Sequence, residues 1–391
     1  MSKRIFYGWI IVAALFIINF ATQAAGTLNL GLFILPMCTD LGISRSLFGW
    51  VTTCRALAGG LSSFFLGPLL DRYGPRILIP VASLITGLGM LGIAASKQVN
   101  HLFLFFAVIG LAGLINTGGG LLSSVPVAKW FVRRRGLVIA LTSLGLGMGS
   151  IIFIPVTQIF IDGYGWRHAW IILAIINMVL TIPVALFFLR RQPEDMGLFP
   201  DGDIEAVPKA DSAGSSYVSE SIWTVREALH TRSFWLITVS LFLSSLATGG
   251  SIHRIAYWVE LGFDPKLVST CFAVDAAGAA VMMLAAGLFL DRFPARFVTA
   301  GTFVGFIIAI ILMIIGSSVM LMFVSGILYG ISVGGLMVCQ TYLWASYYGR
   351  TFLGTIRGIT LPAILLGVAI GSPAVGYVYD LTEMYLFRFD D

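Results

Sequence analysis

The sequence predicts an all-α polytopic membrane protein made of two related helix bundles. Of the 391 residues, 58% are hydrophobic and only 11% are charged, whereas about 25% of the residues in an average soluble domain are charged. The apolar residues gather in eleven stretches, each long enough to cross a bilayer as a helix. A pattern that follows the second stretch returns after the eighth, in the second half of the chain. A water-soluble fold is therefore excluded.

The expected spans follow from apolar windows read along the chain. The first six cover residues 7–36, 47–70, 77–96, 101–128, 136–161 and 167–189, and the next five cover 234–261, 267–290, 297–316, 318–347 and 353–379. The polar stretch between the two groups is rich in acidic residues, and we expect it to be flexible around Ser212 to Ser221. The sequence thus predicts a six-helix bundle over residues 1–190, a linker over 191–233 and a five-helix bundle over 234–391.

Lysine and arginine residues gather at alternate ends of the spans. With the N-terminus inside, 17 of them lie on the inner side and five on the outer side. Cytoplasmic loops of membrane proteins carry such an excess of positive charge. We therefore expect a multi-pass protein of the cell inner membrane with a cytoplasmic N-terminus. These loop ends also explain the net charge of +5, so nucleic acid is not an expected partner.

An internal repeat determines the expected architecture. The stretch from Gly67 to Arg76 contains one aspartate and two arginines, and the stretch from Gly287 to Arg296 repeats them position for position. A second pair of similar segments, Arg135-Gly136-Leu137 and Arg357-Gly358-Ile359, opens the fifth and the eleventh spans at nearly the same offset. Transporters built from parallel repeats have two such halves, with a binding site between them near the middle of the membrane.

The first copy of the repeated loop resembles the best-known loop motif of the major facilitator superfamily, G-x-x-x-D-R-x-G-x-R. Every fixed position matches in this copy, whereas Pro294 replaces the second glycine in the other copy. The resemblance implies the major facilitator fold. Physically, the aspartate caps and pairs across a helix end while the arginines bond carbonyl groups and acidic residues, which latches one conformational state. The expected latch residues are Asp71, Arg72, Arg76, Asp291, Arg292 and Arg296.

Further segments resemble the bacterial oxalate/formate-antiporter and monocarboxylate-transporter-like branch of that superfamily. They include Tyr7-Gly8-Trp9, Gly165-Trp166-Arg167, Phe234-Trp235 and Gly354-Thr355-Ile356-Arg357-Gly358. The chain departs from this branch in two places. Where monocarboxylate carriers usually have an arginine in span eight, the chain reads Met282-Met283-Leu284-Ala285-Ala286, and no twelfth span is expected after residue 380.

Four ionisable residues are the candidates for a charge in the interior of the membrane, namely Arg55, His253, Arg254 and Asp275. A charge at the bilayer centre costs at least about 2.5–3.5 kcal/mol, so each of them needs a partner or a function. Arg55 stands as far before Asp71 in the sequence as Asp275 stands before Asp291. Arg55 and Asp275 therefore occupy the same repeat position with opposite charges.

Arg55 is the first candidate to bind a substrate carboxylate, because a guanidinium can hold a carboxylate with two parallel hydrogen bonds. The alternative is an arginine that pairs with structural groups or extends outward. Asp275 is the candidate proton carrier, because a carboxylate in a low-dielectric site can take up a proton when an anion binds. The alternative is a permanently ionised partner of Arg254 or Arg55.

His253 and Arg254 follow Gly249-Gly250, where two glycines can break the helix and turn it toward a cavity. Tyr257 shares a face with His253, and this pair resembles a substrate contact of the family in span seven. Spans one, four, seven and ten line the cavity in this superfamily, which adds the neutral polar candidates Gln23, Asn116, Gln340 and Tyr342. For each of these four, the alternative is a hydrogen bond between helices worth about 0.6 kcal/mol.

The expected function is secondary active transport of a small organic anion, a monocarboxylate in the first place, by proton symport with alternating access. One alternative is a dicarboxylate/monocarboxylate exchanger that uses both Arg55 and Arg254. Another is a non-transporting membrane sensor or a truncated remnant. No nucleotide-binding loop, metal-ligand cluster or nucleophile triad is visible in the sequence, so we expect neither a cofactor nor an enzyme. The expected partners are the anion, a proton and membrane lipid.

Overall fold

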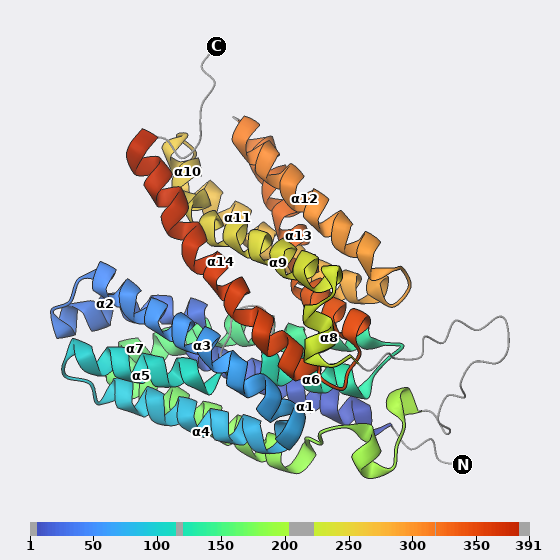
Figure 1. The fold of residues 1–391 in the computed structure, drawn as a ribbon. Helices are drawn as coiled ribbons and strands as arrows, with labels where there is room; N and C mark the ends of the chain where they lie inside the picture. The colour runs from blue at the N-terminus through green and yellow to red at the C-terminus, as the bar shows by residue number, and fades with distance from the viewer. Residues whose placement is uncertain (1–5, 115–119, 203–222, 317, 383–391) are drawn as a thin grey trace. The chain divides into compact units, whose positions relative to one another are not determined.

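The computed structural model describes residues 6–114, 120–202, 223–316 and 318–382, and these form helices and turns without any β-strand (Figure 1). The expected all-α fold is confirmed. The chain forms two compact units. Unit 1 comprises Met1–His230 and Trp344–Pro362, and unit 2 comprises Thr231–Leu343 and Ala363–Asp391. The expected three-part division at residues 190 and 233 stays a prediction.

Unit 1 holds the helices of the first half of the chain. They are α1 (Tyr7–Thr22), η1 (Gln23–Ala25), α2 (Thr27–Leu41), α3 (Arg45–Tyr73), α4 (Pro75–Ala94), α5 (Val99–Ala112), α6 (Leu121–Trp130), α7 (Arg135–Phe188), η2 (Pro193–Met196), η3 (Pro200–Gly202) and α8 (Val225–Leu229). Two later helices contribute to both units: α13 (Val319–Tyr348) ends in unit 1, and α14 (Leu353–Thr382) begins there.

Unit 2 holds most of the second half of the chain. Its helices are α9 (Arg232–Gly250), η4 (Ser251–His253), α10 (Arg254–Glu260), α11 (Pro265–Leu290) and α12 (Ala295–Ile315), together with the first part of α13 and the last part of α14.

Eight helical segments in the described part of the chain are long and apolar enough to span a membrane. One of them, α7, has 54 residues and bends at Gly165, where φ is 79° and ψ is 162°. Glycine adopts this positive φ without steric cost, so α7 holds both the fifth and the sixth expected span. The second expected span coincides with α3, and the fourth falls on α5 and α6. In the part of the chain that the structure describes, each expected span lies mainly on helices, and the chain is a multi-pass membrane protein.

Glycines bring the backbones of the first and fifth spans of each half into contact. In each pair, a β-carbon on the glycine would stand too close to the backbone carbonyl oxygen of the facing helix. The pairs are Gly145 with Phe16, Gly149 with Phe20, Gly367 with Phe242 and Gly371 with Leu246. Small residues at such crossings let membrane helices approach closely. The two halves of the sequence repeat therefore share the same packing.

The turn between α13 and α14 belongs to unit 1 because it bonds to helices of the first half. Arg135 donates a hydrogen bond from Nη1 to the carbonyl oxygen of Ala345 at 3.0 Å. Ser63 donates from its hydroxyl to the carbonyl oxygen of Gly358, also at 3.0 Å. These contacts place the end of α13 beside α7 and the start of α14 beside α3.

Two expectations lie outside the described residues. One is the flexibility of the linker around Ser212 to Ser221, and the other is the absence of a twelfth span, which concerns residues 383–391. Both stay predictions.

Candidate functional site

The seventh expected span is divided into two helices, as its two glycines predict. Helix α9 ends at Gly250, the 3-10 turn η4 follows, and α10 begins at Arg254. A β-carbon on Gly249 would overlap the carbonyl oxygen of Val368 in α14, so a glycine is needed at this crossing. The break therefore places Arg254 in the first turn of a new, short helix.

Arg254 and Asp275 form a buried ion pair in unit 2. Arg254 Nη1 lies 2.9 Å from Asp275 Oδ2, and the two side chains are 6% and 12% exposed. The guanidinium also stands over two aromatic rings, with its Cζ 3.7 Å from the ring centre of Tyr329 and 4.9 Å from that of Phe272. Desolvated cation–π contacts contribute about 2 kcal/mol. The charge of Arg254 is thus held by a carboxylate and by two π faces.

A cavity of about 460 Å³ lies beside this pair within unit 2. Its polar lining residues are Ser251, His253, Arg254, Tyr257 and Tyr329, and the rest of its lining is apolar or glycine. The Tyr257 hydroxyl donates to the carbonyl oxygen of Met313 at 3.2 Å. The Tyr329 side chain is buried, and its hydroxyl lies near the polar groups of Ser251 and Arg254. Apolar pockets with a few convergent polar groups are typical sites for small molecules.

The structure brings several of the predicted residues together at this cavity. His253, Arg254 and Tyr257 line it, and Asp275 is joined to it through Arg254. Sequence reasoning missed Tyr329, which reads as one more aromatic residue of an apolar stretch. The available signal was its neighbour Gly330, which packs against Asp275 and corresponds to Gly110 in the first half of the repeat.

Arg55 lies in α3 of unit 1 and is buried. Its Nη1 donates to the carbonyl oxygen of Ala25 and its Nη2 to the hydroxyl of Thr27, both at 3.0 Å. Within the described part of the chain, no ion pair joins Arg55 to a carboxylate. A guanidinium has five N–H donors, so part of its hydrogen-bonding capacity and all of its charge lack a described partner. Structural bonds therefore account for Arg55 only in part.

The neutral candidates do not gather at the cavity. Gln23 accepts a hydrogen bond from the hydroxyl of Ser150 in α7 at 3.1 Å, which is the interhelical alternative considered for it. Gln340 and Tyr342 are half-buried on α13, and neither belongs to the lining of the cavity. Asn116 lies outside the described residues.

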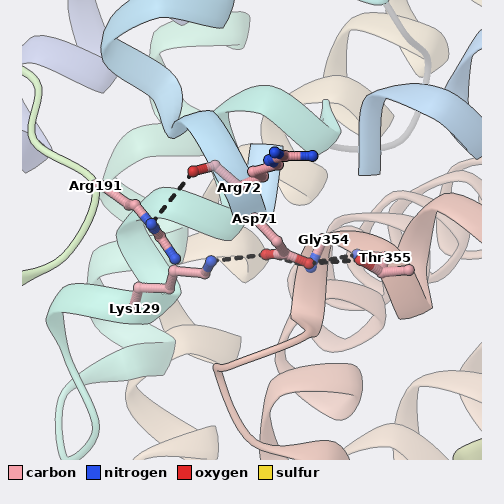
Figure 2. Close-up of polar contacts among 6 residues, drawn as sticks. All are labelled: Asp71, Arg72, Lys129, Arg191, Gly354 and Thr355. Carbon is pink, nitrogen blue, oxygen red and sulfur yellow. Dashed lines mark hydrogen bonds and ion pairs between the residues drawn. The ribbon is translucent and has the colours of Figure 1, made fainter. Parts of the chain in front are cut away.

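Asp71 joins three helices of unit 1, as Figure 2 shows. Its Oδ1 accepts hydrogen bonds from Lys129 Nζ at 2.7 Å and from the backbone N–H of Gly354 at 3.2 Å. Its Oδ2 accepts from the backbone N–H of Thr355 at 2.7 Å and from its hydroxyl at 2.9 Å. Gly354 and Thr355 are in the first turn of α14, where the helix dipole favours a negative charge. Sequence reasoning missed Lys129, which is buried at the end of α6.

The two arginines of the first loop have different surroundings. Arg76 donates from Nε to the carbonyl oxygen of Leu186, near the end of α7, at 2.9 Å. Arg72 is exposed, with its Cζ 5.4 Å from the ring centre of Tyr73. Asp71 and Arg76 therefore make the helix-end and carbonyl contacts that the motif predicts.

The second copy of the loop lies in unit 2. Asp291 is half-buried directly after α11, Arg292 is exposed, and Arg296 is exposed with its Cζ 4.8 Å from the ring centre of Phe297. The latch function of both copies stays a prediction.

The cavity of unit 2 presents a cation with its carboxylate partner and the hydroxyl of Tyr329. A carboxylate that enters the cavity can take the place of Asp275 on Arg254, and Asp275 can then hold a proton. Among the described residues, no group of three or more His, Cys, Asp or Glu side chains is arranged to hold a metal ion.

Known proteins resemble this chain over almost its whole length. Monocarboxylate transporter 13 of Bos taurus is 24% identical, and the match covers 98% of this chain and 85% of that protein. Monocarboxylate transporter 11 of Mus musculus is 26% identical, and the match covers 98% of this chain and 83% of that protein. The crystal structure of the human organic anion transporter MFSD10 (TETRAN) matches with a TM-score of 0.69 at 14% identity, covering 96% of this chain and 94% of that one. The last likeness concerns the fold alone.

A family model matches almost the whole chain, and it agrees with the loop motif, the repeated helix packing and these relatives. The model of the Major Facilitator Superfamily matches residues 15–372, from within the first expected span into the eleventh. The expected family is confirmed, and the chain belongs to the Major Facilitator Superfamily of membrane transporters.

Proposed function

We propose that this protein is a secondary transporter that moves a monocarboxylate together with a proton by alternating access. The observation that carries the proposal is the buried ion pair of Arg254 and Asp275 beside the cavity of unit 2. The relatives that match almost the whole chain are named monocarboxylate transporters, which supports the choice of substrate.

The ion pair offers a way to couple the anion to the proton. Removing one partner of a buried ion pair leaves an uncompensated charge, at a cost of about 3–5 kcal/mol. A substrate carboxylate that replaces Asp275 on Arg254 keeps the arginine compensated. The displaced Asp275 is left in a mostly buried site, and protonation removes its charge. One anion and one proton then bind together without a change in net charge.

Arg55 supplies a second possible contact for a carboxylate, in unit 1. Its hydrogen bonds go to a carbonyl and a hydroxyl, so its charge is compensated by no described carboxylate. A dicarboxylate carries two negative charges, which two cations of the chain can compensate. Arg55 and Arg254, both buried and both named as candidates for an anion, therefore favour a dicarboxylate exchanger as the second candidate function.

Uptake into proteoliposomes distinguishes the two functions. Purified protein is reconstituted and offered labelled monocarboxylates and dicarboxylates, with and without an inward proton gradient, and with or without a dicarboxylate inside. The proposal expects a monocarboxylate to accumulate under the gradient without an internal anion. Uptake that ignores the gradient and requires an internal dicarboxylate supports the exchanger. Failure of every acid to move in both modes contradicts both functions.

A matched pair of arginine variants tests whether the buried pair is responsible. Arg254→Gln is expected to abolish accumulation. Arg167→Gln removes the arginine of an exposed pair, whose Nη1 lies 2.5 Å from Asp40 Oδ2 with side chains 38% and 45% exposed. Because exposed pairs contribute about 0–1 kcal/mol, Arg167→Gln is expected to transport normally. Equal transport by both variants would overturn the role of Arg254.

The charge distribution supports an orientation as part of this proposal. The excess of 17 over five basic residues supports a cytoplasmic N-terminus, with the loop of Asp71 on the same side of the inner membrane. A protease-sensitive tag at the N-terminus should then be cleaved in inside-out vesicles and protected in spheroplasts. The reverse pattern of cleavage would contradict the orientation.

A further inference from the structure

Four arginines lie at the ends of three helices of unit 1 that are in contact with one another. We call them the arginine cluster: Arg72 at the end of α3, Arg76 at the start of α4, and Arg190 and Arg191 after α7. Arg191 donates from Nη1 to the carbonyl oxygen of Arg72 at 3.2 Å, as Figure 2 shows. Arg76, in α4, donates from Nε to the carbonyl oxygen of Leu186 in α7.

The chain is built closely around this cluster. Gly74, which separates α3 from α4, has φ of +77°, and a β-carbon on it would stand 2.9 Å from Arg191 Cβ. The carbonyl oxygen of Arg190 accepts a hydrogen bond from Trp130 Nε1 at 3.3 Å. The backbone that carries the arginines is therefore fixed by contacts between elements far apart in the sequence.

The positive charges of the cluster have no acidic partner among the described residues. Arg190 donates from Nη1 to the carbonyl oxygens of Phe187 and Leu189, at 3.2 and 2.8 Å, and the other three arginines likewise make no described ion pair. The acidic residues nearest in sequence either bind other groups or make no contact with these arginines. Asp71 is bonded to Lys129 and α14, and Glu194 lies 2.6 Å from Arg350 Nη2. Asp195 is exposed and joined to none of the four arginines.

Large apolar side chains are exposed at the same helix ends. They are Leu69, Tyr73, Ile77, Leu186, Phe187 and Phe188. In a multi-pass membrane protein, exposed apolar side chains on the spans face lipid chains. The arginine cluster thus adjoins an apolar surface at the level where spans end, which is the level of lipid headgroups.

We propose that the arginine cluster binds the headgroup phosphate of an anionic phospholipid. Guanidinium groups bind phosphate oxygens with paired hydrogen bonds. Arg76 uses only its Nε to bond Leu186, so both of its Nη atoms can donate to a phosphate. Basic pockets between membrane helices bind anionic headgroups in this way. The apolar side chains beside the cluster, such as Ile77 and Phe187, accommodate the acyl chains, which a free phosphate does not use. This site is separate from the proposed transport function.

The repeat supplies a matched control. Arg296 occupies the position of Arg76 in the second copy of the loop. It is exposed over Phe297 and makes no side-chain hydrogen bond to a described residue. Arg296→Gln therefore removes the same charge from the same motif position without touching the arginine cluster.

Native mass spectrometry of the detergent-purified protein tests the proposal. The wild type and three variants, Arg76→Gln/Arg191→Gln, Arg76→Lys/Arg191→Lys and Arg296→Gln, are titrated with phosphatidylglycerol or with phosphatidylcholine carrying the same acyl chains. We expect wild type and Arg296→Gln to bind phosphatidylglycerol in preference to phosphatidylcholine. The glutamine double variant should lose about tenfold in affinity for phosphatidylglycerol, and the lysine double variant less.

Two further arms identify the source of the phosphate. Inorganic phosphate and deacylated glycerophosphoglycerol are added as competitors, and we expect both to compete weakly because they lack acyl chains. Competition as strong as that of the lipid would overturn a lipid site in favour of a free anion. Equal binding of both lipids by the wild type, or unchanged phosphatidylglycerol binding by either double variant, would overturn the proposal. The lysine variant keeps this test open if the glutamine variant fails to fold.

Discussion

Gly330 lies directly against Asp275, and a β-carbon on Gly330 would overlap the backbone carbonyl oxygen of Asp275. Gly110 has the same relationship to Arg55 in unit 1, where a β-carbon would overlap the carbonyl oxygen of Arg55. The two glycines are related by the same sequence offset as the two copies of the loop, and so are the two charged residues. Each half of the chain therefore places its buried charge at a helix crossing that has no room for a side chain.

Alanine at these glycines should destabilise the protein. Gly110→Ala and Gly330→Ala force two backbones apart, and such overpacking costs about 1–3 kcal/mol. The expected result is a lower melting temperature in detergent. Gly147→Ala and Gly301→Ala are the controls, because nothing lies within 4 Å of a β-carbon at either position. Equal melting temperatures for all four variants would contradict the close crossings.

The equivalence of Arg55 and Asp275 could be predicted from the sequence because it depends only on linear order. Both residues interrupt apolar stretches, and both stand equally far before the repeated loop. The partner of Asp275 could not be predicted, because the sequence allowed either Arg254 or Arg55. The pairing depends on which way Arg254 faces after the break at Gly250, and the spacing of two glycines does not determine the geometry of that break.

Lys129 and Tyr329 show a second limit of sequence reasoning. Lys129 ends an apolar stretch, so it reads as a loop charge. The structure buries it against Asp71, which lies far earlier in the chain. Tyr329 reads as part of an apolar span, and only the folded chain places its ring under Arg254. Both roles arise from contacts between distant segments, which hydropathy and spacing do not encode.

The Asp71–Lys129 pair should behave as a buried ion pair. Asp71→Asn and Lys129→Met each leave one charged or polar partner uncompensated, which costs about 3–5 kcal/mol for a buried pair. The double variant removes both charges and should be more stable than the sum of the single effects predicts. Denaturation of all four proteins in the same detergent measures the coupling. Strictly additive losses would mean that the 2.7 Å contact contributes nothing.

Tyr329 should act on Arg254 through its ring and on a ligand through its hydroxyl. Tyr329→Phe keeps the ring under the guanidinium, so stability should change little while affinity for the transported acid falls. Tyr329→Leu removes the ring as well and should lower stability by about 1–2 kcal/mol more. Melting curves and substrate binding of the two variants separate these roles. A loss of stability in Tyr329→Phe equal to that in Tyr329→Leu would contradict the assignment to the ring.

Arg55 should tolerate lysine poorly if it binds a carboxylate. Arg55→Lys keeps the charge but cannot form two parallel hydrogen bonds to one carboxylate, so affinity should fall sharply. Arg55→Ala should abolish binding. Both are compared with Arg45→Lys and Arg45→Ala, at the first residue of the same helix. Unchanged binding by correctly inserted Arg55→Ala protein would exclude Arg55 from the anion site.

Asp275→Asn should separate proton coupling from anion binding. Asparagine has nearly the shape of aspartate and imitates its protonated form permanently, so Arg254 no longer has to be released from a charged partner. Accumulation driven by a proton gradient should be lost, whereas exchange of labelled for unlabelled acid should persist, because exchange needs no net movement of protons. Asp264→Asn is the control on the same helix: Asp264 is the exposed N-cap of α11, and asparagine caps a helix equally well. It should transport like the wild type. Accumulation by Asp275→Asn under a gradient, at the rate of Asp264→Asn, would place the coupling group elsewhere in the chain.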